Sequence, residues 1–193
     1  MIRLFTILYK LDLNKNYSVI SLFRDVEKSF HLHSAHCPKC KAKGHLSFHD
    51  NYGRNLVTYE NEHVQENHII IRRVYCSSCD KTSAILPDII VPHKSYSILF
   101  ILYVMKVYFF KTMTVAALCS HFGISVATLY AWKKQYLSHK KLDLGKLEKY
   151  LFKQDPHLSE PITIFRSDFL HDFFQRFGFS FLQYARATIS DSS

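Results

Sequence analysis

The sequence predicts an α+β fold in which a small β module is followed by a helical bundle. Residues 65–75 are rich in β-branched side chains, which favour strands. From Ser95 onward, apolar residues recur at helical spacing up to residue 153. Pro87 and Pro92 separate the two parts, because proline disfavours the helical conformation in the residue before it.

Local patterns place the individual elements. Apolar residues at helical spacing predict an amphipathic helix over residues 17–30, ahead of the β module. Strands are expected at 45–52 and 65–75, and the segment between them is interpreted as a turn with a further strand or loop. The helices expected after the β module cover residues 95–111, 114–122, 125–139, 143–153 and 167–177.

Four of the five cysteines form two pairs of equal spacing, Cys37-Pro-Lys-Cys40 and Cys76-Ser-Ser-Cys79. Two intervening residues let both thiolates of a turn point at one ion, and two such turns supply the four ligands of a structural zinc site. The 35 residues between the pairs fit a β-hairpin, as in a zinc ribbon. Four thiolates close the coordination shell, so the expected zinc is structural and stabilises the β module.

Other interpretations of these cysteines have less support. A redox pair needs a thioredoxin-like βαβ scaffold, and structural disulfides need an oxidising compartment; neither is indicated here. His36, His45 and His49 lie near the pairs and are interpreted as solvated or packing residues, with His36 in place of one cysteine as an alternative. Cys119 falls within an expected helix, where we expect it to pack.

Residues 114–136 have the pattern of a helix-turn-helix. Thr114 can cap the first helix, and Gly123 suits the left-handed conformation at the turn. Ile124 is expected to fill the core between the helices, and Ser125 is a good N-cap for the second. The inward residues of the first helix are expected to be Val115, Leu118, Cys119 and Phe122.

The second helix of this motif has two sides of different character. One side is expected to pack inward through Leu129, Trp132, Lys133 and Tyr136. The other side carries small residues that permit close approach to base edges, together with groups that can contact bases or phosphates. The residues expected to contact DNA are Ser125, Ala127, Thr128, Tyr130, Ala131, Lys133, Lys134, Lys140 and Lys141.

The positive charge is concentrated around this motif. The chain has a net charge of +9, and residues 91–153 hold ten lysines against Asp143 and Glu148. Such a local excess attracts polyanions, because their condensed counterions are released on binding. The alternative is a solvated basic face that maintains solubility.

Two sequence blocks carry a resemblance to a known family. FGISVATLYAWKKQY is similar to the recognition region of bacterial insertion-sequence transposases and their helper proteins. The CPKC pair, the Tyr52-Gly53-Arg54 element and IIIRRVYCSSCDKTSAILPDIIVPHKSYS resemble the amino-terminal zinc ribbon of ISL-type transposases and of short transposon-associated proteins. The resemblance covers about 37–140. It implies that Cys37, Cys40, Cys76 and Cys79 are zinc ligands and that residues 125–136 form a recognition helix.

The chain departs from a complete transposase of this type, which continues into a large RNase H-like nuclease domain. Only 40 residues follow residue 153, too few for that sheet and its metal ligands, so no catalytic site is expected. The leading hypothesis is a zinc-containing protein that binds double-stranded DNA in transposition or in the regulation of a mobile element. One alternative is an accessory or truncated transposase subunit whose catalytic partner, a transposase or recombinase, is encoded separately. Two others are a compact nuclease and a zinc-ribbon module that binds protein or RNA.

The expected organisation has four parts: a leader at 1–36, the zinc ribbon at 37–92, the helix-turn-helix domain at 93–153 and an aromatic-rich helical tail at 154–193. The tail is expected to pack on the bundle or on a partner, including a second copy of the chain. The strongest apolar run, 97–110, contains Lys106 and is shorter than the about 20 residues of a membrane span. With no signal peptide recognised, we expect a cytoplasmic protein that contacts no membrane.

Overall fold

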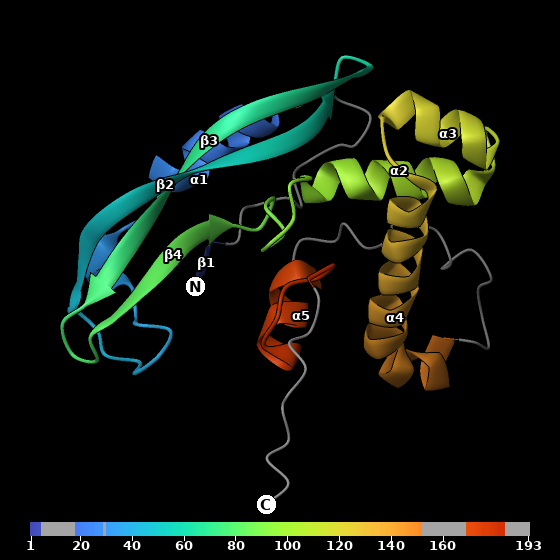
Figure 1. The fold of residues 1–193 in the computed structure, drawn as a ribbon. Helices are drawn as coiled ribbons and strands as arrows, with labels where there is room; N and C mark the ends of the chain where they lie inside the picture. The colour runs from blue at the N-terminus through green and yellow to red at the C-terminus, as the bar shows by residue number, and fades with distance from the viewer. Residues whose placement is uncertain (5–17, 29, 152–168, 184–193) are drawn as a thin grey trace, which may run out of the picture.

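The computed structural model describes residues 1–4, 18–28, 30–151 and 169–183 of the chain, without the side chains of Val26, Phe169, Asp172 and residues 140–151. The fold is α+β, as the sequence predicts: a twisted sheet carries the cysteine cluster and is followed by a group of helices (Figure 1). Strand order in the sheet is β1-β4-β3-β2, with β1 parallel to β4 and the other neighbours antiparallel. These strands span Ile2–Leu4 (β1), Leu46–Glu60 (β2), His63–Cys76 (β3) and Lys81–Pro87 (β4).

The β2–β3 hairpin dominates the sheet and is longer than expected. The strand expected at 45–52 does not stop there, because β2 continues to Glu60 and pairs with β3 as far as His63. Asn61 and Glu62 form the turn, both with positive φ (51° and 64°), as two-residue hairpin turns of the I′ type require. The turn at Asn61 and Glu62 contains no glycine, so pattern analysis did not reveal this extension.

Two strands were missed altogether. β1 has only three residues, and β4 has its last residues buried on both faces, so neither shows the alternation that identifies a strand. They pair in parallel, with Ile2 opposite Ile85 and Leu4 opposite Pro87. Arg3 between them is anchored by a hydrogen bond from its guanidinium to the carbonyl oxygen of Ile90, at 2.9 Å.

Helices follow the sheet nearly as expected, with one correction. The break expected between residues 139 and 143 does not exist, because α4 runs continuously over Val126–Leu151. Lys140, Lys141 and Leu142 all favour helix, and nothing at these positions removes a backbone donor. The helices span Val19–Lys28 (α1), Ile98–Phe110 (α2), Val115–Phe122 (α3), Val126–Leu151 (α4) and Phe169–Phe177 (α5), and a short 3-10 turn η2 covers Leu32–Ser34.

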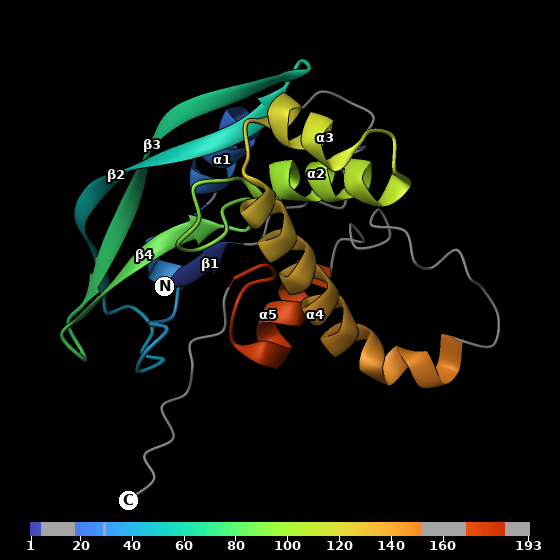
Figure 2. The same ribbon diagram turned by 45° about the vertical axis from the view of Figure 1, so that its right-hand side comes forward.

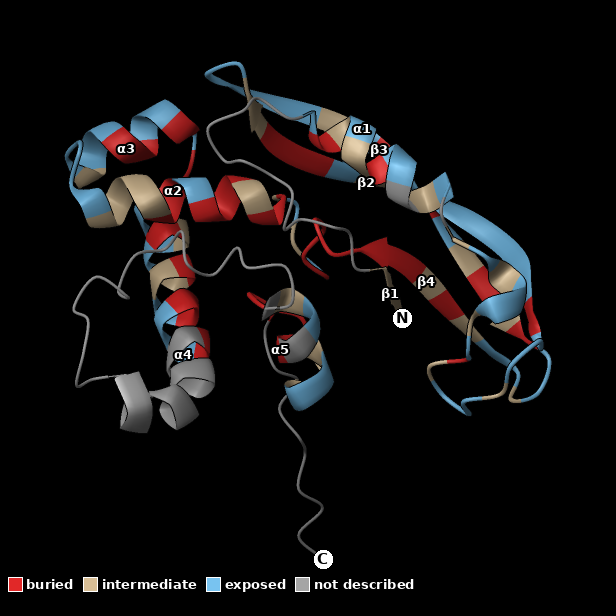
Figure 3. Cartoon of the chain, turned by 180° about the vertical axis from the view of Figure 1, so that it is seen from behind, coloured by how far each residue is buried: buried red, intermediate tan, exposed pale blue. Residues whose placement is uncertain are grey.

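One hydrophobic core joins the sheet to the helices. Leu56, Ile69 and Ile71 of the hairpin lie in the same buried cluster as Phe100 of α2 and Trp132 of α4. Figure 3 shows buried residues, in red, along the hairpin, α2 and the first part of α4. A smaller cluster surrounds the cysteines and includes Leu46, Val74 and Ile85. The ribbon and the bundle therefore pack against each other directly.

The connector before α2 fixes this arrangement by pairing with the edge of β2. The backbone N–H of Val57 donates to the carbonyl oxygen of Ser95 at 2.7 Å, and that of Ser97 donates to Val57 at 2.9 Å. Arg54 donates to the carbonyl oxygens of Val91, at 2.8 Å, and of Lys94. The connector thus pairs with the edge of β2 at Val57, and the Arg54 side chain holds it to the same strand just before α2 begins.

The described part of the aromatic tail packs on α4 of the same chain. The backbone N–H of Leu182 donates to Nδ1 of His139 at 2.9 Å, and both residues are buried. Phe173 of α5 and Phe181 surround the His139 ring, with centroids 5.1 and 5.5 Å away. Burial lowers the pKa of His139 to about 4, and the nearby charge of Lys94 adds to this effect.

Within the described residues, no single helix is both long and apolar enough to cross a bilayer. The pair α3 and α4 passes that test of length and composition only when the two are joined across a bend of 101°.

Candidate metal centre and nucleic-acid interface

Two short turns that are copies of each other hold the four paired cysteines. We name residues 37–41 the first knuckle and residues 76–80 the second knuckle. In each, the last residue adopts a left-handed conformation, Lys41 at φ 65° and Asp80 at φ 53°. Its N–H donates to the carbonyl oxygen of the first cysteine, at 2.9 Å for Cys37 and 3.0 Å for Cys76. The shared backbone path turns both thiols of each pair to the same side.

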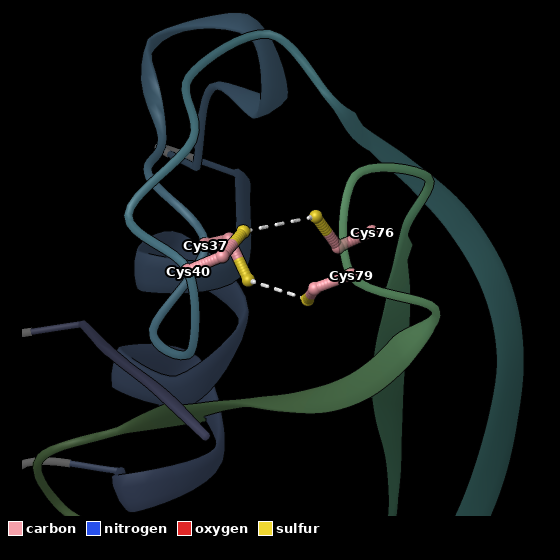
Figure 4. Close-up of side chains that lie close together, drawn as sticks. All are labelled: Cys37, Cys40, Cys76 and Cys79. Atoms are coloured by element: carbon pink, nitrogen blue, oxygen red, sulfur yellow. Dashed lines mark hydrogen bonds between the residues drawn. The ribbon is translucent and has the colours of Figure 1, made fainter.

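The knuckles face each other and bring all four thiols together, as Figure 4 shows. Sγ of Cys37 lies 3.7 Å from Sγ of Cys79, and the same distance separates Cys40 from Cys76. The four sulfur atoms lie within 4.8 Å of one another. A tetrahedral zinc site with Zn–S bonds of about 2.3 Å has sulfur atoms about 3.8 Å apart, whereas a disulfide needs about 2.05 Å. The cluster thus has the dimensions of a tetrathiolate metal site.

The electrostatics of the cluster are compatible with a bound cation. Burial acts to raise the pKa of the Cys37 thiol, but backbone N–H groups of the turn and neighbouring thiols lower it to about 6. One of these donors is the N–H of Lys39, 3.4 Å from the sulfur. Burial and the adjacent thiols raise the pKa of Cys79 to about 12. Four sulfur atoms this close cannot all be thiolates without a divalent ion between them.

The second candidate site is the helix-turn-helix formed by α3, the turn 123–125 and α4. The helix axis changes direction by 101° across this turn, within the range of about 90–120° typical of the motif. Gly123 has φ 61°, and its N–H donates to the carbonyl oxygen of Ser120. The N–H of Ile124 reaches Cys119 at 3.0 Å, which completes a Schellman cap. The sequence-based expectation for Gly123 therefore matches the geometry.

Hydroxyl caps begin both helices of the motif. Thr114 accepts a hydrogen bond from the N–H of Ala117 at 3.3 Å, and Ser125 accepts one from Thr128 at 3.0 Å. The side chains of Ser125 and Thr128 also lie within hydrogen-bond distance, at 2.9 Å. The Ser125 cap explains why α4 starts at Val126, directly after the turn that follows α3 (Figure 2).

The face of α4 expected to contact DNA is largely exposed. Ser125, Ala127, Tyr130 and Lys134 are exposed, while Thr128 and Ala131 are half-buried beside them. On the opposite side Leu129, Trp132 and Tyr136 are buried, as the helical spacing predicts. The side chains of Lys140 and Lys141 lie outside those that the structure describes.

Lys133 stands apart from the other predicted contacts. Its Nζ donates to the hydroxyl of Tyr108 in α2 at 2.7 Å and lies 4.9 Å from the centroid of that ring. The ring of Tyr130 is also near, at 5.8 Å. Sequence reasoning missed Tyr108, because a partner on another helix leaves no signal in local spacing. In this structure Lys133 links α2 to α4.

Comparison with known proteins gives two overlapping matches. Residues 37–122 match a domain of unknown function (DUF6431), and residues 103–142 match a helix-turn-helix domain. No curated protein and no solved structure shows significant similarity to the chain. The first match begins at Cys37 and includes all four clustered cysteines, and the second includes α3 and the exposed part of α4. The chain thus combines a helix-turn-helix, which supports DNA binding, with a cysteine cluster that suits zinc.

Proposed function

We propose that this protein binds specific sites in double-stranded DNA through α4 and depends on one structural zinc ion held by Cys37, Cys40, Cys76 and Cys79. The observation that carries the proposal is the accessible first half of α4, presented at 101° to α3 after a Ser125 cap. Small residues at the start of this face, such as Ala127, permit close approach to base edges in a major groove.

The proposed roles of the side chains on α4 and of the zinc ion follow from where they lie. Thr128 and Tyr130 stand on the face proposed to meet bases, whereas Lys134 is an exposed cation suited to a phosphate. Zinc takes no part in reading DNA: it holds the knuckles, and the knuckles hold the end of the hairpin. The proposed units are the zinc ribbon at 37–92 and the helix-turn-helix domain at 93–153.

We further propose that the protein serves a bacterial mobile element in the cytoplasm, in transposition or in its regulation. The support is the resemblance of residues 37–140 to the amino-terminal region of ISL-type transposases. The same resemblance supports an accessory role, in which the protein acts together with a separately encoded transposase or recombinase. Reconstitution with the recombinase encoded nearest to this gene tests this part: a change in strand transfer on adding the zinc-loaded protein supports it, and no change contradicts it.

DNA binding is tested by selection from a pool of random duplexes with the zinc-loaded protein. We expect one enriched site. The variant Thr128→Ala should relax base preference at one position of that site, whereas Lys134→Ala should weaken all duplexes alike. Arg24→Ala, which removes an exposed cation on α1, is the matched control and should change neither. Recovery of no enriched site by zinc-loaded protein contradicts the proposal.

A further inference from the structure

A second basic surface lies away from the helix-turn-helix. It is an open groove of about 1220 Å³ lined by residues of β1, β2 and β4, the first knuckle, the connector before α2, and α5 with the residues that follow it. Arg3 lines it from the sheet, Lys39 and Lys41 from the first knuckle, Lys94 from the connector and Phe177 from α5. None of the residues assigned above to DNA contact lines this groove.

The charged side chains that line the groove are all basic, and the nearby charge of Asp88, which does not line it, acts on Arg3. Five of its lining residues are lysines or arginines, two more are histidines, and no carboxylate occurs among the described side chains that line it. Arg54 donates to backbone carbonyl oxygens, so these bonds fix its guanidinium without neutralising it. Lys39 and Lys41 are exposed. Cations focused in a recess of this kind attract phosphate groups more strongly than the same charges on a flat face.

Aromatic side chains share the groove with these cations. Tyr52 is 38% exposed on β2, and Phe177 and Phe179 are half-buried at the opposite wall. The volume exceeds the roughly 300–1,000 Å³ of typical small-molecule sites, which favours a chain-like ligand. A cationic groove with aromatic rings is the arrangement by which proteins hold unpaired nucleotides, with phosphates on the cations and bases stacked on the rings.

We propose that this groove binds single-stranded nucleic acid. Lys39 and Lys41 contact its phosphates, and Tyr52 stacks on a base. Both lysines belong to the first knuckle, so the metal centre that shapes the knuckle also positions one wall of the groove. The site is separate from α4, and either site can fail without the other.

The experiment measures fluorescence anisotropy of an oligothymidine of about 12 nucleotides, a length suited to such grooves. The zinc-loaded full chain is titrated, and Lys39→Gln/Lys41→Gln is compared with Lys43→Gln/Lys81→Gln. The control pair removes the same charge from two exposed lysines of the same module that lie outside the groove lining. Zinc content of each variant verifies that the knuckles are intact, and Tyr52→Leu tests stacking.

The double variant Lys39→Gln/Lys41→Gln should weaken oligothymidine binding about tenfold. It should also reduce the slope of log K against log salt by about 1.4, because two phosphate contacts are lost. The control variant Lys43→Gln/Lys81→Gln should change the affinity for oligothymidine less than twofold. Both double variants should still bind duplex DNA. The proposal is overturned if the two double variants lose the same affinity for oligothymidine, or if the wild-type chain does not bind oligothymidine. A loss confined to duplex binding also overturns it, because the groove then extends the duplex surface. The duplex selection described above fails or succeeds independently of these results.

Discussion

The hydroxyl of Tyr59 lies 3.1 Å from Nε2 of His121, which ties the turn end of the hairpin to the first helix of the helix-turn-helix. The Tyr59 ring also stacks on Tyr103 of α2, with centroids 4.9 Å apart, and meets Phe122 edge-on at 5.2 Å. The cysteine cluster lies at the other end of the same hairpin, where β3 ends at Cys76. The hairpin therefore joins the cysteine cluster to the helix-turn-helix.

A double-mutant cycle measures this connection. Tyr59→Phe removes only the hydroxyl, and His121→Ala removes the ring that faces it. We expect a coupling free energy of about 0.5–1 kcal/mol in urea unfolding, because the bond is exposed to solvent. In the control cycle, Tyr130→Phe replaces Tyr59→Phe, since Tyr130 is an exposed tyrosine on α4. Tyr130→Phe and His121→Ala should show no coupling. Coupling of similar size in both cycles would mean that the Tyr59–His121 bond contributes nothing specific.

The cysteines differ sharply in their expected importance. Cys76→Ser should abolish stoichiometric zinc in metal analysis and lower the free energy of unfolding by several kcal/mol, because the β module lacks the ion that joins its knuckles. Cys119→Ala changes a buried cysteine of α3 outside the cluster and should keep one zinc per chain. A Cys76→Ser protein that retains full zinc and full stability would show that the cluster is not the metal site.

Gly123 is required for its backbone conformation alone. A Cβ at this position would meet nothing within 4 Å, but φ is +61°, where residues with a side chain are strained. Gly123→Ala should therefore lower the free energy of unfolding by about 1–2 kcal/mol, and Gly123→Asn by less, since asparagine tolerates this conformation. Chemical denaturation of both variants measures the difference. Equal losses would point to a cause other than φ.

The metal centre and the helix-turn-helix were accessible to sequence analysis because both depend on short-range chemistry. The spacing of two cysteine pairs fixes which thiols can meet, and Gly123 with Ser125 marks a turn whatever surrounds it. The structure places these residues as the patterns predict. The expected DNA contacts on α4 remain predictions, although four of them, Ser125, Ala127, Tyr130 and Lys134, are exposed.

The features that were missed depend on distant partners. β1 exists only because β4 offers it a parallel edge, and three residues carry no periodic signal. The long arm of β2 is stabilised by its pairing with β3 and by the connector that covers its edge. Lys133 was expected on the inward side of its helix and at a phosphate, and its actual partner in the structure, Tyr108, lies 25 positions earlier in the chain. Pairing across such separations cannot be derived from local patterns.

Acid should loosen the C-terminal segment through His139. Its pKa is lowered to about 4 in the folded protein, while an unfolded histidine titrates near 6.5, so the unfolded chain binds a proton first as pH falls. Stability is therefore complete above pH 6.5 and is lost between about pH 6.5 and pH 4, by on the order of 2 kcal/mol. His139→Asn keeps an acceptor for the Leu182 N–H and does not titrate.

The measurement is the thermal midpoint of both proteins across this pH range. The cysteine cluster and the other titrating groups are common to both proteins, so the difference in pH slope isolates His139. A variant with the same slope as the wild type would show that His139 is protonated in the folded state at the same pH as in the unfolded chain.

Two adjacent lysines of α4 should behave differently on DNA. Lys134 is exposed, so Lys134→Ala should weaken every duplex and reduce the slope of log K against log salt by about 1. Lys133 is held by the Tyr108 hydroxyl and ring, so Lys133→Ala should instead lower the free energy of unfolding by about 1 kcal/mol and leave that slope unchanged. Salt titrations of duplex binding distinguish the two. If Lys133→Ala reduces the slope as much as Lys134→Ala does, the Lys133 amine must leave Tyr108 for a phosphate, and α2 and α4 must lose a link each time DNA binds.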